Sequence, residues 1–290
     1  MAADVDRRGT GGQPGPVAAK PHRGFLHCLP DAAMVELDQV DGRVRRAVEH
    51  LVSSHAAARL LGLDAARELL LPRSGRVNDA SEQVLPFLFA LAESPGYPHA
   101  AGVLRRLWEA LAALDDPPRS RTRGPAANGP ASDGVFSALQ RRAPRLLRVA
   151  RTSRDPEAAR TAALMAAHFP HVDAELLPLL VALVSGAPDP QQRAPLLYRL
   201  AAAQGHPPHP LTLRALQEPQ PRVDGAAVAL AWADHHAARL SASHRALAAR
   251  ALQASAENIQ ETQGWPDPRG CGRRHDPRAA REALRRLTSR

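Results

Sequence analysis

Aromatic residues and cysteine are scarce in this chain. Phe, Trp and Tyr make up 3% of its 290 residues, although apolar residues make up 44%. The core must therefore be built from Ala, Leu and Val, and because Ala and Leu are strong helix formers, this composition favours an all-α protein over a β-rich one. The two cysteines, Cys28 and Cys271, lie far apart in the sequence. This excludes a disulfide framework and favours a reducing compartment, for which we expect the cytoplasm.

Long apolar runs are also missing. The longest, Leu176 to Val184, is interrupted by Pro178, and it is too short to cross a bilayer. The N-terminus carries charges but no apolar stretch, so we expect no signal peptide. We therefore expect no membrane partner.

Lysine is almost absent, since Lys20 is the only one, yet the net charge is +9 because arginine is abundant. This excess of positive charge has two explanations. An anionic partner such as nucleic acid would select for it. A GC-rich genome would also produce a high Arg-to-Lys ratio, together with the 27 prolines and 19 glycines of this chain. We favour the second explanation, because net charge informs on association and solubility and not on fold.

Two markers recur at one spacing in the middle of the chain. Asp155 and Asp189, each followed by proline, are 34 residues apart, and so are Pro144 and Pro178. Asp-Pro is a helix start signal, because Asp caps the exposed amide groups and proline at the first helical position gives up no helical hydrogen bond. A period of this length is typical of helix pairs stacked into a solenoid. The markers therefore predict an α-solenoid of about five helix pairs.

The repeated stretches resemble the HEAT-repeat family of armadillo-like α-solenoids. In each, Asp-Pro is followed by an arginine and then by small or aliphatic residues: Asp155-Pro156, Arg160 and Ala163-Leu164 in one, Asp189-Pro190, Arg193 and Leu196-Leu197 in the next. The likeness is best over 135–235, and in layout it resembles HEAT-repeat proteins common in GC-rich bacteria. It implies stacked antiparallel helix pairs. Families with such repeats include scaffolds, adaptors, relatives of phycobilin lyases and a group of DNA glycosylases, so the fold does not choose the function.

The pattern divides the chain into five segments. We expect a disordered leader at 1–30, divergent N-terminal helical repeats at 31–114, a Pro/Gly-rich insertion at 115–134, HEAT-like repeats at 135–262, and an irregular segment with a basic C-terminal helix at 263–290. In the segment from Pro156 to Phe169 we expect one packing face of alanines: Ala159, Ala162, Ala163, Ala166 and Ala167.

Solenoids bind partners on their concave face. We therefore predict a non-enzymatic scaffold or adaptor that holds an unidentified protein or peptide and needs no cofactor. The leading candidate surface includes the helices expected at Leu176–Val184 and Leu211–Leu216. The alternative is a nucleic-acid-binding protein, or a relative of the HEAT-like DNA glycosylases, that uses its arginine-rich faces.

Two sets of arginines would serve that alternative. Each set shares a helical face: Arg278, Arg281 and Arg285 near the C-terminus, and Arg141, Arg145 and Arg148 near the middle. Such faces could bind phosphates. For the C-terminal set we favour another role, a polar outer face on the last helix, because terminal repeats need one to remain soluble.

Metal and catalytic motifs are weak. Zinc normally needs three or four converging ligands, whereas the histidines occur in isolated pairs: His168 with His171, His206 with His209, and His235 with His236. We therefore predict no metal site. Cys271 and His275 lack the oriented base and oxyanion site that a thiol nucleophile requires. Trp232 with Asp234 is the nearest approach to a flipped-base pocket, but one aromatic ring beside one carboxylate does not make such a pocket.

Overall fold

The computed structural model of the protein describes residues 24–71, 79–115, 130–169, 173–204, 207–218, 222–257 and 277–288. Over these residues the fold is all-α, with 13 α-helices and no strand, as the composition predicts. The helices are α1 (Asp31–Leu37), α2 (Gly42–Leu51), α3 (Ala56–Leu70), α4 (Asp79–Glu93), α5 (Ala100–Asp115), α6 (Pro130–Thr152), α7 (Pro156–Ala166), α8 (Asp173–Gly186), α9 (Pro190–Ala203), α10 (Pro210–Gln217), α11 (Arg222–His235), α12 (Ala242–Glu257) and α14 (Pro277–Thr288). Short 3-10 helices lie at Leu26–Cys28 and Ala237–Arg239.

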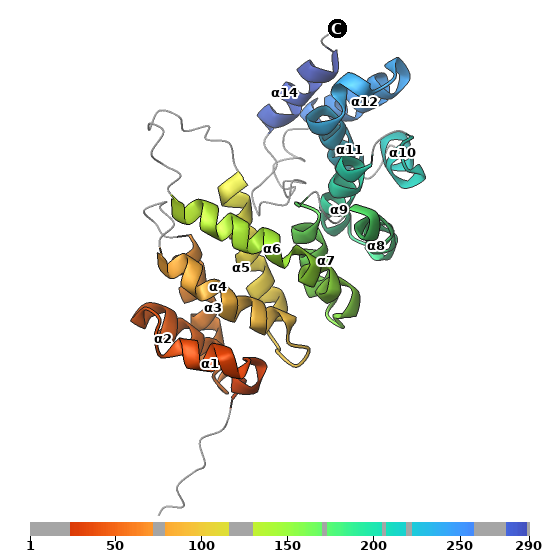
Figure 1. Cartoon of the computed structure of the whole chain (residues 1–290). Coiled ribbons are helices and arrows are strands. Elements are labelled where there is room, and N and C mark those ends of the chain that lie inside the picture. Colours follow the sequence, from red (N-terminus) through yellow and green to blue (C-terminus); the bar gives the residue numbers. More distant parts are fainter. Residues whose placement is uncertain are drawn as a thin grey trace, which may run out of the picture.

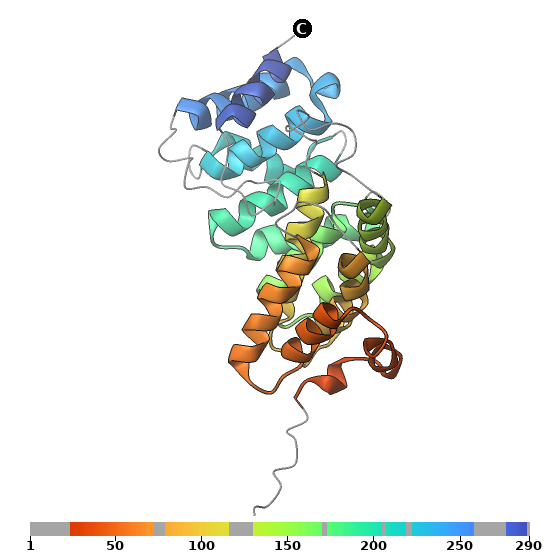
Figure 2. The same cartoon turned by 90° about the vertical axis from the view of Figure 1, so that its left-hand side faces the viewer.

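The helices form an elongated array, with α1 and α2 at one end and α12 and α14 at the other (Figures 1 and 2). Neighbours in the sequence pack in pairs: α2 on α3, α4 on α5, α6 on α7, α8 on α9, α10 on α11, and α12 on α14. The second members of these pairs also contact one another in series, from α3 through α5, α7, α9 and α11 to α14. Among the first members, α4 packs on both α2 and α6, and α10 packs on α12.

The Asp-Pro doublets begin helices, as predicted. The carboxylate of Asp155 accepts hydrogen bonds from the backbone amides of Glu157 and Ala158 at 2.8 and 3.3 Å, and proline opens α7. Asp189 caps α9 in the same way, with Oδ1 2.9 Å from the amide of Gln191. The aspartate replaces hydrogen bonds that the first turn of a helix cannot make internally.

The other recurring prolines lie inside helices. Pro144 is an internal residue of α6 and Pro178 of α8. An internal proline removes one main-chain hydrogen bond and bends the helix. The spacing between Pro144 and Pro178 therefore marks a repeated position within two helices and not the beginning of either.

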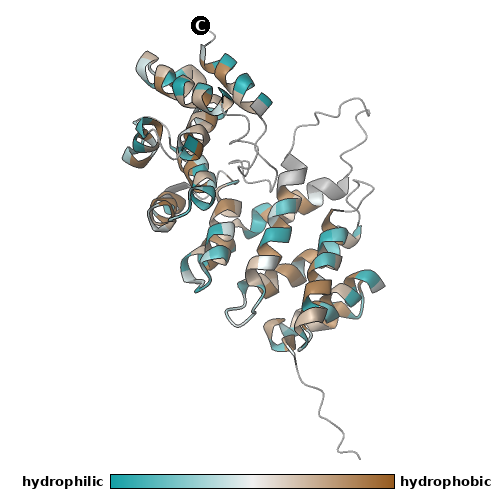
Figure 3. Cartoon of the chain, turned by 180° about the vertical axis from the view of Figure 1, so that it is seen from behind, coloured by the Kyte–Doolittle hydropathy of each residue, from teal (hydrophilic) through white to brown (hydrophobic). Residues whose placement is uncertain are grey.

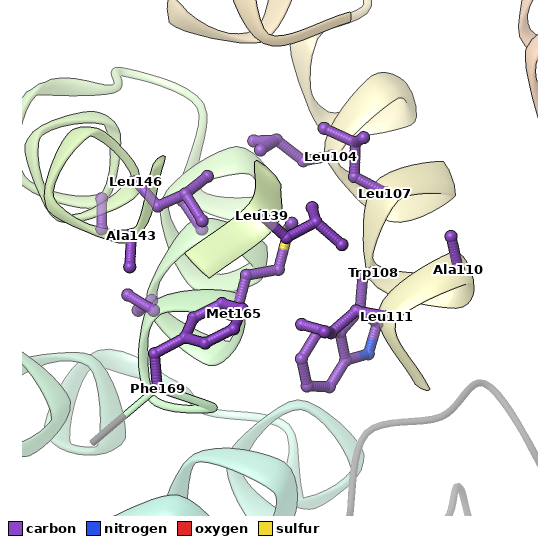
Figure 4. Packing of buried hydrophobic residues seen from close by; sticks show 14 of the residues in the cluster. Leu104, Leu107, Trp108, Ala110, Leu111, Leu139, Ala143, Leu146, Met165 and Phe169 are labelled. Carbon is purple, nitrogen blue, oxygen red and sulfur yellow. The ribbon is translucent and has the colours of Figure 1, made fainter. Parts of the chain in front are cut away.

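Close packing of small and aliphatic side chains forms the core. Four of the five alanines expected on the packing face of α7 are buried, Ala162, Ala163 and Ala166 completely, while Ala167 is half-buried. Larger side chains fill the space between α5, α6 and α7 (Figure 4). There Trp108, Leu139, Met165 and Phe169 come together.

The expected leader and insertion need correction at their inner ends. Residues 24–30 belong to the folded array: the amide of Phe25 donates to the carbonyl of Val52 at 2.6 Å, and Cys28 and Leu29 are buried. This apolar cluster is too short to show a helical period, so the sequence pattern missed it. Helix α6 begins at Pro130, so residues 130–134 are helical and not part of the insertion. Proline favours this first position. Asp115, the first residue of the expected insertion, is the last residue of α5. Residues 1–23, 116–129 and 258–276 lie outside the described residues.

In the described part of the chain, no helix combines the length and the apolar character that crossing a bilayer requires.

Ala163→Asp should destabilise the protein strongly. Ala163 is fully buried in α7, so the new carboxylate would lie unpaired between helices, at a cost of about 3–5 kcal/mol. Chemical denaturation of the variant and the wild type measures this difference. Ala246→Asp, at an exposed position of α12, is the control and should change stability little. Equal stability of wild type and Ala163→Asp would show that α7 packs through another face.

Candidate functional site

Helix α8 is apolar on all sides but covered on only part of its surface. Leu176, Leu180 and Val184 face the core and are almost fully buried, and the helix packs on α9 and less extensively on α7. Of the intervening residues, Leu177, Leu179, Val181 and Leu183 are half-buried and pack in part against the core, and Pro178 and Ala182 are exposed. A helix that is hydrophobic all round is normally buried. The outer face of α8 therefore presents an uncharged apolar strip.

Helix α10 lies beside α8 at the same edge of the array (Figures 1 and 3). Its Leu211 and Leu213 are half-buried. A cavity of about 220 Å³ lies between the two helices, and Val184 and Leu211 contribute to its walls. The two helices singled out from the sequence thus border one hollow.

An ion pair between a partly exposed arginine and a buried aspartate lines this cavity. Asp224, in the first turn of α11, is 4% exposed, and its Oδ2 lies 2.6 Å from Nε of Arg193 in α9. The guanidinium also donates through Nη1 to the carbonyls of Ala187 and Pro188, at 3.0 and 3.3 Å. Asp224 Oδ1 is buried and has no hydrogen-bond partner. One carboxylate oxygen is therefore satisfied and the other is not.

Burial dominates the electrostatics of Asp224. It raises the pKa of this carboxyl to about 6, because desolvation outweighs the hydrogen bond and the positive charge of Arg193. The carboxylates of Glu218 and Asp189 add to the rise. Asp224 therefore takes up a proton close to neutral pH.

Close contact between α10 and α11 places Asp224 at the cavity. A Cβ atom at Gly225 would lie 2.9 Å from the carbonyl oxygen of Ala215. Glycine is required because any side chain would push the two helices apart. The sequence analysis did not single out Asp224. Its one signal is a lone carboxylate in the otherwise apolar run that follows Arg222.

The C-terminal arginines lie on the outside of α14. Arg278, Arg281 and Arg285 are exposed, whereas the opposite face of the helix, with Ala280 and Leu287, is buried. Nη2 of Arg285 is 3.0 Å from a carboxylate oxygen of Glu282. The neighbouring Arg286, not in the predicted set, reaches Asp234 at 3.2 Å.

The arginines of α6 are partly paired. Arg141 and Arg148 are exposed, but Nη1 of Arg145 is 3.4 Å from Glu93 of α4. Arg142 reaches the same carboxylate at 3.7 Å and lies over the ring of Phe89. Glu93 therefore reduces the positive charge of this face, and sequence spacing alone did not indicate this contact.

The histidine and tryptophan candidates have structural neighbours. The Trp232 ring is 2% exposed and packs against His244, while the Asp234 carboxylate accepts a hydrogen bond from Tyr198 at 2.9 Å. The histidine contacts are His168 Nδ1 to Arg199 Nη2 at 3.3 Å, His209 Nδ1 to the Leu211 amide at 3.2 Å, His235 Nε2 to Tyr198 Oη at 3.2 Å, and His236 Nε2 to the Ala202 carbonyl at 3.0 Å. Within the described ranges, no three His, Cys, Asp or Glu side chains converge as metal ligands would. His171, His206, Cys271 and His275 lie outside those ranges.

Asp224→Asn should flatten the dependence of stability on pH. The pKa of Asp224 is about 6 in the folded chain and 3.8 as the reference value. Protonation of Asp224 therefore adds about 3 kcal/mol to the free energy of unfolding. This contribution is fully present below about pH 4 and is lost as the pH rises through 6. Urea denaturation at several pH values measures the free energy of unfolding. Parallel pH curves for wild type and variant would contradict the raised pKa, which carbon NMR of the Asp224 carboxyl checks directly.

No protein-family model, no curated protein and no solved structure matches the chain. The likeness to HEAT repeats therefore rests on the chain's own residues, and the function has to be inferred from the surface around α8 and α10.

Proposed function

We propose that the chain is an α-solenoid of HEAT-like helix pairs and acts as a non-enzymatic scaffold. It binds a segment of another protein along the surface formed by α8 and α10, which we call the α8–α10 face. The paired packing of successive helices supports the solenoid. The Asp-Pro starts of α7 and α9, which recur after 34 residues, support the repeat. The buried free Cys28 is compatible with the cytoplasm, where we place the protein.

The observation that carries the binding function is the outer face of α8. Between Leu176 and Val184 this helix has no charged residue, and Pro178 and Ala182 are exposed within that stretch. Apolar area stabilises a complex by about 25 cal/mol for each Å² removed from water. Contiguous apolar surface beside a cavity is typical of protein interaction sites.

A nucleic-acid-binding function is the second candidate. The exposed positions of Arg278, Arg281 and Arg285 favour it, because exposed arginines on one helical face can neutralise successive phosphates. It ranks below the scaffold because Glu282 lies within the α14 face and Glu93 beside the α6 face. The glycosylase version has less support still. Trp232 is buried, and Asp234 is held by Tyr198 and Arg286.

Ala182→Arg should abolish partner capture. The substitution adds a charged side chain to the apolar strip of α8 and leaves the core untouched, because Ala182 is exposed. Tagged wild type and variant serve as baits in nuclease-treated lysate, and mass spectrometry compares the recovered proteins. We expect partners to fall by about tenfold or more. The matched control is Ala246→Arg in α12, also exposed. Equal capture by all three baits would contradict binding at the α8–α10 face.

Replacing Arg278, Arg281 and Arg285 together by Glu should leave partner capture nearly intact, because charged residues on an exposed outer helix are poor hot spots. The same three proteins, wild type, triple variant and Ala182→Arg, are tested for DNA binding by fluorescence anisotropy at increasing salt. A nucleic-acid-binding protein would show affinity that falls steeply with salt and disappears in the triple variant. That result would replace the scaffold by the second candidate. DNA binding that survives the triple change would move the contact to Arg141, Arg145 and Arg148.

A further inference from the structure

The first helix pair leaves large apolar side chains exposed. Leu60 and Leu61 of α3 are 54% and 60% exposed, and α3 packs on α2 at the end of the array opposite α14 (Figure 1). A helix at the end of such an array needs a polar outer face, and α14 has one, formed by its exposed arginines. Helix α3 departs from this pattern. An exposed apolar face of this kind marks a surface on which another element packs.

A cavity opens beside α2 and α3, which supply the described residues of its wall. Its volume is about 610 Å³, within the roughly 300–1,000 Å³ of typical binding pockets. Ala47 of α2 and Ala65 and Leu69 of α3 line it with apolar side chains. Leu61 lies one turn before Ala65, and residues four apart share a helical face. The cavity and Leu61 therefore form one apolar groove, which we call the α2–α3 groove.

Positive charge lies along the α2 side of the groove. Arg43, Arg46 and His50 share one face of α2, since they are three and four residues apart, and all of them line the cavity. Within the described ranges, the side chain of Arg46 has neither a hydrogen bond nor an ion pair, and it is exposed. A ligand in the groove can therefore reach the guanidinium of Arg46 directly from solvent.

The two carboxylates near the groove leave this charge uncompensated. Asp41 lies 3.2 Å from Nε of Arg43, but exposed ion pairs of this kind are weak, so Arg43 can exchange Asp41 for a carboxylate of a ligand. Glu68 lines the α3 side and has an interaction partner of its own. Arg46 therefore favours an anionic group on the α2 side and disfavours a cationic one.

We propose that the α2–α3 groove binds an acidic amphipathic helix of a partner protein, which packs its apolar side chains on Leu61, Ala65 and Leu69 and directs its carboxylates to Arg43 and Arg46. Within the array, α4 packs on both α2 and α3, and α5 packs on α3. The partner helix would pack in the same manner on the side where Leu61 is exposed. An amphipathic helix in an apolar groove is a recurring mode of recognition. This site is independent of the α8–α10 face.

Three peptides of about 15 residues, long enough to form a helix in water, test the groove without knowledge of the partner. The first has leucines on one helical face and glutamates along one edge of it. The second has lysine in place of each glutamate. The third has the composition of the first in an order that gives no apolar face, and it controls for attraction by the net charge of +9.

Fluorescence anisotropy of the labelled peptides measures their binding to the full-length protein. We expect the acidic amphipathic peptide to bind with a dissociation constant on the order of 10 μM, and the other two at least about tenfold more weakly.

Arg46→Glu should weaken binding of the acidic peptide by about tenfold or more and strengthen binding of the lysine peptide, because it reverses the charge on the α2 side. A reversed preference cannot result from unfolding. Leu61→Asp should weaken binding of both amphipathic peptides. Both positions are exposed, and circular dichroism checks the fold of each variant. The matched control is Arg250→Glu, at an exposed position of α12, which should bind both peptides as the wild type does.

Equal affinity for the acidic and lysine peptides would overturn the proposal, and so would equal affinity for the acidic peptide and its reordered form. Wild-type binding by Arg46→Glu and Leu61→Asp would place the contact outside the groove. Sedimentation velocity distinguishes another occupant. If the wild type forms a dimer that Leu61→Asp dissociates, the groove is an interface between two copies of this chain and not a site for an acidic partner.

Discussion

Close approach of helices with small residues on their contact faces is the constraint on which this structure depends. With few aromatic side chains to fill space, the core is closed by bringing backbones together, as at the buried Ala162 and Ala163 of α7. Packing at this density tolerates little change in volume. At the contact of Gly225 with the carbonyl of Ala215, even one added methyl group would not fit. Each helix therefore has a narrow range of positions relative to its neighbour.

The same closeness creates the polar chemistry of the α8–α10 face. Helix α11 approaches α10 so closely that Asp224, next to Gly225, is removed from water and depends on Arg193 of α9 for compensation. Desolvation exceeds that compensation and raises the pKa of Asp224 to about 6. The pKa of a carboxylate on an exposed helix turn would not be raised in this way. The unsatisfied oxygen and the shifted pKa are both consequences of tight packing between helices.

Helix α8 shows what happens where that packing is incomplete. It is as apolar as a core helix, yet it packs chiefly on α9, and its Pro178 and Ala182 remain exposed. In contrast, α14 buries Ala280 and Leu287 and turns its arginines outward, which is the amphipathic division expected of a helix at the end of an array. Helix α8 leaves apolar residues exposed, and helix α14 gives this end of the array a charged outer face.

The sequence by itself determined the all-α class, the helix starts at Asp155 and Asp189, and the alanine face of α7, because capping and helical periodicity are local properties of the chain. The sequence also indicated the arginine faces of α6 and α14. It did not indicate that Glu93 of α4 would neutralise part of the positive charge of the α6 face. Only the tertiary structure brought Arg193 to Asp224 and left a cavity beside them. Burial, pairing and pKa depend on residues distant in sequence, and no local pattern specifies which of them will meet.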